Sequence, residues 1–421
     1  MPDALTWPNG FTWLFLAALF FATATRLWLG LRQIRHVLAH RDAVPASFAD
    51  SIPLSAHQKA ADYTAAKTRL GAIDLVVGAV IVLAFTLGGA LQWLADAWAR
   101  VFTAGGLAHG TALLLSVFFI QGVLSLPLAL YRTFVVEARF GFNRMTIGLF
   151  ITDLAKQVVI ALLLGVPLLL AVLWLMGQMG HLWWLYAWIV ITLFSLVLQL
   201  IFPALILPLF NKFTPITEGE LAQRIAALLA RCGFKSSGLY KMDGSKRSSH
   251  GNAFFTGFGA TKRIVLFDTL VERLDPSEVE AVLAHELGHY KLHHVVKMVV
   301  LSTAMTFAGL WILGQLIDKP WFYAGLGVRT PSTAAALALF MLVVSEFTFF
   351  LQPLMAVYSR RREYEADAYA TQHANAGELV RALVKLYQDN AATLTPDPMH
   401  SAFYDSHPPA ALRIARLKGA T

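Results

Sequence analysis

The stretch DPSEVEAVLAHELGH, residues 275–289, predicts a capped helix that carries two histidines one turn apart. Asp275 is a typical N-cap residue, and it is followed by a proline at the first helical position and a glutamate three residues after the cap. His285 and His289 are four residues apart, so they lie on one face of this helix. Both imidazoles can therefore reach a single metal ion.

A glutamate directly follows the first histidine, which gives the pattern His-Glu-x-x-His. This pattern is typical of zinc sites in which Glu286 acts as a base toward water. We therefore expect one Zn²⁺ per chain. A catalytic zinc takes three protein ligands, so a third residue is required. The extended pattern that would supply it nearby needs Gly at 292 and His at 295, but Leu292 and Val295 stand there.

A glutamate on a later helix is the favoured third ligand. Glu363 and Asp367 lie about seventy residues downstream and one turn apart. Glu363 could bind zinc while Asp367 accepts a hydrogen bond from the outer nitrogen of a ligand imidazole. Glu365 is interpreted as a bystander. Two alternatives stay open: His293, on the same predicted helix face, as a rival ligand, and a solvated acidic face without a metal.

The composition predicts an integral membrane protein. Apolar residues make up 57% of the chain and charged residues 14%, and the mean hydropathy is +0.58. Seven segments are long enough to span a bilayer. They are residues 11–31, 72–95, 111–131, 157–177, 183–207, 297–317 and 333–357. We interpret the first as a retained helix, although Ala22-Thr23-Ala24 resembles a signal-peptide cleavage site.

Basic residues predict the orientation, because Lys and Arg gather in cytoplasmic loops. The first and third loops carry most of them: Arg32, Arg35, Arg41, Lys59, Lys67, Arg69, Arg132, Arg139, Arg144 and Lys156. The N-terminus is therefore expected outside, with the zinc helix and the C-terminus facing the cytoplasm. The net charge of +8 suits contact with anionic membrane lipids. No nucleic-acid motif is present, and the single Cys232 permits neither an internal disulfide nor a cysteine zinc site.

Four regions follow along the chain. They are 1–210 with five membrane helices and cytoplasmic loops, 211–296 as a cytoplasmic catalytic insert, 297–357 with membrane helices six and seven, and 358–421 as C-terminal cytoplasmic helices. Residues 41–70 are expected to form a cytoplasmic helical hairpin. Polar residues in or beside the spans predict a polar interior. They are Asp74, Gln121, Glu137, Asp153, Lys156 and Gln199.

The insert is predicted to contain a small sheet. Strand-like runs at residues 237–242, 253–258 and 263–267 are separated by turn residues and precede the zinc helix. An exposed sheet edge beside a metal can hold an extended peptide through main-chain hydrogen bonds. Asn252, at the start of the second run, is the candidate for holding that peptide. Its alternative role is that of a turn asparagine.

The zinc motif, the run at residues 363–367 and the seven spans together resemble the type I CAAX prenyl endopeptidases, which are zinc metalloproteases of the membrane. Further stretches similar to that family occupy residues 127–143, 208–213, 250–254 and 405–409. The resemblance covers nearly the whole chain. It implies a mainly α fold in which seven transmembrane helices surround a large intramembrane chamber.

The resemblance also implies site residues and a reaction. His285, His289 and Glu363 would bind zinc, Glu286 would be the base, His407 would stabilise the oxyanion, and Asn252 with Ala253 and Phe254 would align the substrate. Members of the family remove the last three residues of CAAX sequences whose cysteine is prenylated. The alternative role of His407 is that of a residue in a helix-capping loop.

The native substrate stays open between prenylated CAAX sequences and other peptides. The alanine-rich composition and short loops indicate the bacterial cytoplasmic membrane, or the endoplasmic reticulum membrane in a eukaryote. One alternative function is a membrane quality-control zinc protease, which has fewer spans before its zinc helix. A second, of another class, is a non-catalytic zinc protein or a transporter, but a structural zinc site takes four protein ligands and no adjacent base.

Overall fold

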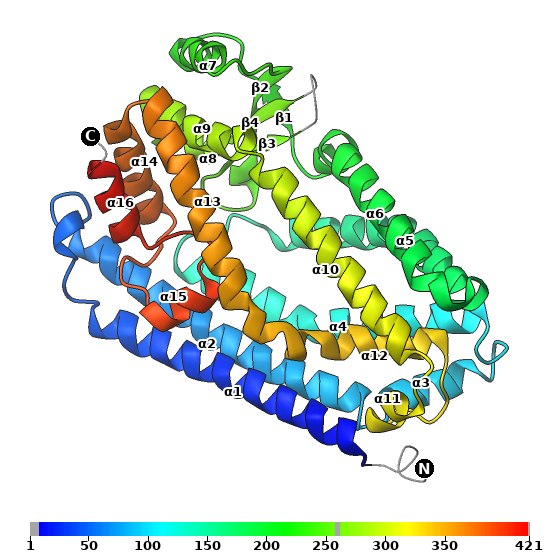
Figure 1. The fold of residues 1–421 in the computed structure, drawn as a ribbon. Coiled ribbons are helices and arrows are strands. Elements are labelled where there is room, and N and C mark those ends of the chain that lie inside the picture. The colour runs from blue at the N-terminus through cyan, green and yellow to red at the C-terminus, as the bar shows by residue number, and fades with distance from the viewer. Residues whose placement is uncertain (1–7, 257–261, 420–421) are drawn as a thin grey trace.

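The computed structural model describes residues 8–256 and 262–419, which are predominantly helical (Figure 1). The α-helices are α1 (Gly10–Ala39), α2 (Leu54–Phe85), α3 (Ala90–Trp98), α4 (Leu107–Tyr131), α5 (Ile147–Gln178), α6 (Trp183–Ile201), α7 (Glu220–Arg231), α8 (Asp268–Arg273), α9 (Pro276–Lys291), α10 (His294–Leu316), α11 (Pro320–Gly325), α12 (Thr333–Thr348), α13 (Gln352–His373), α14 (Ala376–Asp389), α15 (Pro398–Tyr404) and α16 (Ala410–Lys418). The strands are β1 (Phe213–Pro215), β2 (Gly238–Met242), β3 (Ala253–Thr256) and β4 (Arg263–Phe267).

Seven helical segments in the described residues are long and apolar enough to cross a membrane, which confirms the predicted number. They are Gly10–Ala39, Leu54–Phe85, Leu107–Glu137, Ile147–Gln178, Gly180–Leu209, His294–Leu316 and Thr333–His373. Two of them contain a π-helical turn, at Arg132–Glu137 after α4 and at Phe202–Ile206 after α6. The second turn includes Pro203, which lacks the amide proton that a regular α-helix needs.

The long helices contact one another in a closed order (Figure 1). α1 packs on α2, α2 on α4, α4 on α5, α5 on α6, α6 on α10, α10 on α12, and α12 again on α1. A core of buried side chains from α1, α4, α5 and α12 fills one end of this ring. Toward the other end, a cavity of about 630 Å³ is lined in part by Arg26, Lys67 and Asp74. Charged groups from the spans therefore line a cavity between α1, α2, α13 and α15.

The second span differs from its prediction at both ends. The helix begins at Leu54, so residues 54–70 are the first half of α2 and no separate hairpin forms at 41–70. It ends at Phe85 because Gly88 packs against the backbone of Ala84 and Gly89 takes a left-handed conformation with φ of 75°. The predicted span at 72–95 therefore covers parts of two helices, α2 and α3, which these glycines separate.

Two of the polar residues predicted in the spans, Glu137 and Asp153, connect separate elements of the structure. The hydroxyl of Tyr63 on α2 donates to Glu137 at 2.7 Å. Asp153 on α5 accepts from Nε of Arg247 at 2.7 Å. These contacts join the membrane helices to each other and to the insert, so the carboxylates of Glu137 and Asp153 are paired.

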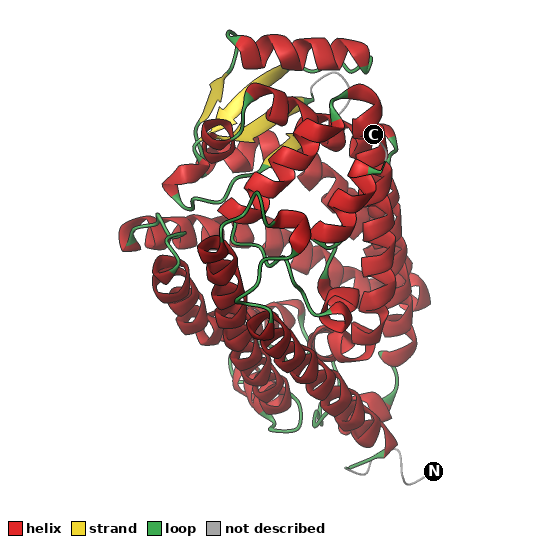
Figure 2. Cartoon of the chain, turned by 90° about the vertical axis from the view of Figure 1, so that its left-hand side faces the viewer, coloured by secondary structure: helices red, strands yellow, loops and turns green. Residues whose placement is uncertain are grey.

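A four-stranded sheet lies at the end of the molecule farthest from the N-terminus (Figure 2). Its order is β1-β2-β4-β3, with β2 and β4 parallel and the other pairs antiparallel. β1 is missing from the sequence prediction, since three residues ending in Pro215 give no alternating pattern. The predicted strand at 253–258 is β3, and its last two residues lie outside the described part of the chain. β3 is an edge strand.

α9 lies at the centre of the insert and begins as the sequence predicts. Asp275 and Glu278 form a reciprocal capping box around Pro276. The helix packs against α7, α13 and α14. Its buried apolar side chains are Val279, Ala281, Leu283, Ala284 and Leu287. Burial on several sides fixes the rotation of α9 about its axis, and with it the direction of the two histidines.

Candidate metal centre and substrate cleft

α9 and α13 approach each other unusually closely at the two histidines. Gly288 lies between His285 and His289 in the sequence, and a Cβ built on it would be 3.0 Å from Cα of Ala366. A side chain at this position would therefore force the helices apart. The absence of a side chain at Gly288 lets Glu363 on α13 come within reach of both imidazoles.

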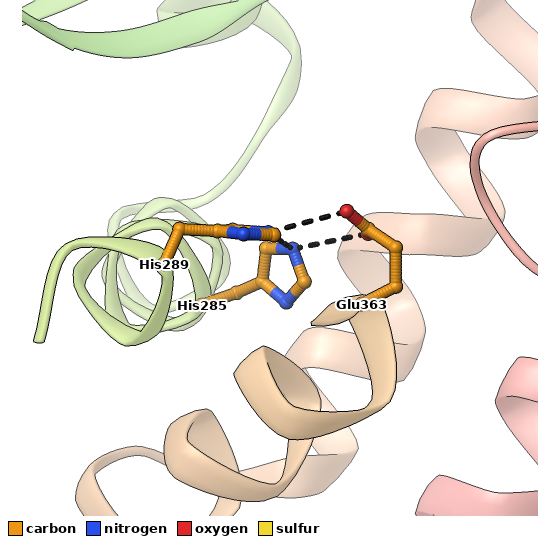
Figure 3. Close-up of side chains that lie close together, drawn as sticks. All are labelled: His285, His289 and Glu363. Carbon is orange, nitrogen blue, oxygen red and sulfur yellow. Dashed lines mark hydrogen bonds and ion pairs between the residues drawn. The ribbon is translucent and has the colours of Figure 1, made fainter. Parts of the chain in front are cut away.

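The three predicted ligands converge on one point (Figure 3). Nε2 of His285 and Nε2 of His289 are 3.1 Å apart. Glu363 places Oε1 3.2 Å from Nε2 of His289 and Oε2 3.4 Å from Nε2 of His285. Ligand atoms about 2.0–2.1 Å from a tetrahedral zinc ion are separated by roughly 3.3 Å. Because Oε2 of Glu363 is buried without a hydrogen-bond partner, the three side chains fit a zinc ion.

The outer nitrogen of His285 is held by a buried ion pair. Nδ1 lies 2.8 Å from Oδ1 of Asp367, which matches the role that the sequence predicts for Asp367. Arg413 on α16 donates from Nε and Nη2 to both oxygens of this carboxylate, each at 2.7 Å. All three side chains are buried. With the proton on Nδ1, Nε2 of His285 carries the lone pair that can face the metal, and Nη2 of Arg413 lies 3.3 Å from it.

The outer nitrogen of His289 faces a residue that the sequence interpretation missed. Nδ1 of His289 lies 3.0 Å from Nδ1 of the buried His294. Nε2 of His294 lies 2.9 Å from Oε2 of Glu365. Glu365 is therefore not a bystander.

The rival ligand His293 does not belong to the zinc helix. α9 ends at Lys291, and His293 has a positive φ of 58° where the chain turns into α10. It therefore does not continue the helix face of the two histidines. Among the described residues, the side chains whose ligand atoms converge for a metal are His285, His289 and Glu363.

A cavity of about 250 Å³ opens beside the two α9 residues that start the motif. It is lined by Gly251, Asn252, Ala253, Leu270, Val282, His285, Glu286, Leu379, Leu383, Leu386, Tyr387, Asn390, His407 and Arg413. Burial raises the pKa of the Glu286 carboxyl, while the imidazoles of His285 and His289 act in the opposite direction. The cleft thus brings a half-buried carboxylate, an imidazole and a sheet edge to one side of the candidate metal site.

His407 reaches the site from the loop between α15 and α16. Its Nε2 lies 3.5 Å from Oε2 of Glu363, and its Nδ1 lies 3.0 Å from the hydroxyl of Ser406. The side chain is 60% exposed. It can therefore meet a substrate in the cleft without first breaking a buried contact.

Of the three predicted substrate-binding residues, two line the cleft. Asn252 precedes β3, and its Oδ1 accepts a hydrogen bond from the amide of Ala253 at 2.8 Å. Both residues line the cavity, but Phe254 does not. Successive side chains of a strand point to opposite faces, and the Phe254 ring packs instead against Phe267. Only the main chain of Phe254 is left to contact a substrate.

Replacing Gly288 with valine should abolish metal binding, because a branched side chain cannot fit between α9 and Ala366. Metal content after purification and dialysis is the measurement. Valine at Gly165 on α5 is the control, since a Cβ there meets no atom within 4 Å. If Gly288→Val protein still binds one metal ion per chain, the close approach of α9 and α13 is not required for metal binding.

Comparisons with known proteins cover the whole of this architecture. A family described as CAAX prenyl protease N-terminal, five membrane helices, matches residues 33–212. A second family, described as Peptidase family M48, matches residues 215–421. The chain is 33% identical to the CAAX prenyl protease 1 homolog of Arabidopsis thaliana, over 93% of this chain and 94% of that protein. It is 35% identical to the Homo sapiens homolog over 73% of this chain and 72% of that protein.

A solved structure agrees with the fold. The crystal structure of S. mikatae Ste24p superposes with a TM-score of 0.88 at 30% identity, covering 97% of this chain and 99% of that one. The five membrane helices before the insert agree with the predicted architecture and disfavour the quality-control alternative. Membership of a peptidase family likewise favours an enzyme over a transporter. The chain therefore belongs to peptidase family M48 and is a multi-pass membrane metallopeptidase that acts on peptide or protein substrates.

Proposed function

We propose that the protein is a zinc endopeptidase that cleaves near the C-terminus of CAAX-type substrates, with His285, His289 and Glu363 as the zinc ligands. The observation that carries this proposal is the convergence of the three ligand atoms at 3.1–3.4 Å beside an edge strand and a carboxylate. The names of the relatives, CAAX prenyl protease 1 homologs from plant and human, support the substrate class.

The chemistry is general-base hydrolysis. When bound, zinc acts as a Lewis acid toward the substrate carbonyl and lowers the pKa of water to about 7. Glu286 accepts a proton from the attacking water and passes it to the leaving amine. His407 donates a hydrogen bond to the carbonyl oxygen as negative charge develops there. No side chain forms a covalent bond to the substrate.

The sheet edge positions the scissile bond. β3 pairs with β4 on one side only, and its other edge is available to an extended peptide. Asn252 and Ala253 lie where this edge meets the cleft. Asn252 already accepts from the next amide through Oδ1, so its side-chain amide N–H groups are the donors that would meet a substrate carbonyl.

The membrane part of the proposal follows from the spans. Seven apolar segments and the loop charges favour a site that faces the cytoplasm and an N-terminus outside, and the alanine-rich composition with short loops favours a bacterial cytoplasmic membrane. A prenyl chain would enter the ring of helices from the surrounding membrane lipids, while the peptide would lie along β3. Unprenylated peptides that can extend along β3 remain the second substrate class.

Replacing Asn252 with alanine should raise KM more than it lowers kcat, because the residue aligns the peptide rather than taking part in proton transfer. We expect a change in KM of about tenfold, in keeping with the loss of one or two hydrogen bonds. The control is Gln223→Ala, which removes an exposed side-chain amide on α7 outside the cleft. A normal KM with lowered kcat would contradict the assignment.

The test of the whole proposal uses the purified full chain in detergent. The protein is stripped with a chelator, titrated with zinc, and assayed on a farnesylated CAAX peptide and the same peptide without the lipid. We expect activity to return at one zinc per chain and to be higher on the farnesylated peptide. Full activity without metal would refute the zinc site. Equal cleavage of both peptides would refute the lipid preference alone.

A further inference from the structure

We propose that His294 and Glu365 form a positioning pair that fixes the tautomer and ring orientation of His289, the second candidate zinc ligand. The inference deepens the proposed function, because it concerns the same metal site. It rests on two contacts, from Nδ1 of His289 to Nδ1 of His294 at 3.0 Å and from Nε2 of His294 to Oε2 of Glu365 at 2.9 Å.

The proton positions follow from hydrogen-bond chemistry. His289 turns Nε2 toward the other two ligands, so that nitrogen must offer a lone pair and Nδ1 must carry the proton. The Nδ1–H group then donates to Nδ1 of His294, which must be an acceptor. His294 consequently carries its own proton on Nε2 and donates it to Glu365. Both hydrogen bonds therefore form when Nδ1 of His289 and Nε2 of His294 each carry one proton.

The two ligand histidines are thus oriented by separate partners. Asp367 and Arg413 hold His285 in a fully buried ion pair, whereas Glu365 is 54% exposed. Partners of ligand histidines typically contribute 10–100-fold to metal affinity. Glu365 is exposed to water, whereas His294 is only 4% exposed. We therefore expect His294 to account for most of the zinc affinity that is gained by orienting His289.

The pair also joins three helices at one point. His289 lies on α9, His294 is the first residue of the membrane helix α10, and Glu365 lies on α13. A metal ligand is therefore fixed in orientation by the beginning of a candidate span. Loss of the pair should let the imidazole of His289 rotate, because its ring is only partly buried.

The experiment measures zinc affinity by competition with a chelator, together with the visible absorption of the Co²⁺-substituted protein, in the full chain. His294→Phe fills the space but removes the acceptor. His294→Asn keeps an acceptor, because Oδ1 of asparagine takes nearly the place of Nδ1. The matched control is His293→Asn, at the exposed neighbouring position with positive φ, which asparagine tolerates.

We expect His294→Phe to weaken zinc binding by about 10–100-fold and to change the Co²⁺ spectrum, while His294→Asn and His293→Asn stay close to wild type. Wild-type affinity and spectrum in His294→Phe would overturn the inference. If that variant does not fold, His294→Ala, which also removes the acceptor but adds no bulk, decides by the same two readouts. Because no step needs peptidase activity, a wild-type chain that binds no zinc would instead overturn the proposed function.

Discussion

Glu286→Ala protein should keep its metal and its fold while losing peptide cleavage by about a thousandfold or more, which corresponds to about 4 kcal/mol in the activation barrier. The loss is this large because Glu286 both accepts the proton of the attacking water and returns it to the leaving amine. The carboxylate lines the cleft beside His285 but is not among the three converging ligand atoms. Metal affinity should therefore be little affected.

The measurement pairs zinc content with the initial rate on a farnesylated CAAX peptide. Glu272→Ala is the control, since Glu272 is an exposed carboxylate on the neighbouring helix α8. Cleavage at the wild-type rate by Glu286→Ala protein with bound metal would exclude Glu286 as the base. Loss of the metal would instead place Glu286 among the groups that hold it.

Arg413→Leu protein should lose about 3–5 kcal/mol of folding stability, because removing one partner of a buried ion pair leaves the other charge uncompensated. Arg413 is 5% exposed, donates twice to Asp367, and lies 3.8 Å from Glu363. The pKa of Arg413 is raised, since its hydrogen bond to Asp367 and the nearby carboxylates outweigh the effect of burial. The buried carboxylate of Asp367 therefore depends most on this guanidinium.

Thermal unfolding in detergent, with the metal bound and after chelation, measures this effect. Arg416→Leu on the same helix is the matched control, because Arg416 is exposed and its described contact is with the ring of Tyr364. Arg413→Leu should also lower metal content, since Asp367 would no longer be held against His285. An unchanged unfolding temperature in both states would contradict the role assigned to the ion pair.

The sequence predicts those parts of the site that lie within one helix. The capping box at Asp275 and the four-residue spacing of His285 and His289 depend only on local geometry. The same is true of Glu363 and Asp367 on α13. The number of spans follows from hydropathy, which needs no tertiary contact. These features follow from the chain because each involves neighbours in sequence.

The missed residues depend on how separate elements meet. Arg413 contacts Asp367 from another helix, 46 residues further along the chain, and no local pattern indicates that packing. His294 is only five residues after His289, but on a continuous helix it would point about 140° away. It reaches His289 because the chain turns at His293. A prediction that continues α9 past Lys291 therefore places His293, rather than His294, beside the ligand histidines.

The last span and the third candidate ligand belong to one continuous helical segment, Thr333–His373. Within it, a 3₁₀ turn at Phe349–Leu351 followed by Pro353 separates α12 from α13, and the two helices run in different directions (Figure 1). Glu363 lies eleven residues after Gln352, the first residue of α13, so a change of about 5° in the angle at this bend would move the backbone at Glu363 by roughly 1.4 Å. Packing against neighbouring helices sets the tilt of such spans. The angle between the last span and the ligand-bearing helix is therefore a mechanical link between the packing of the membrane helices and the candidate metal site.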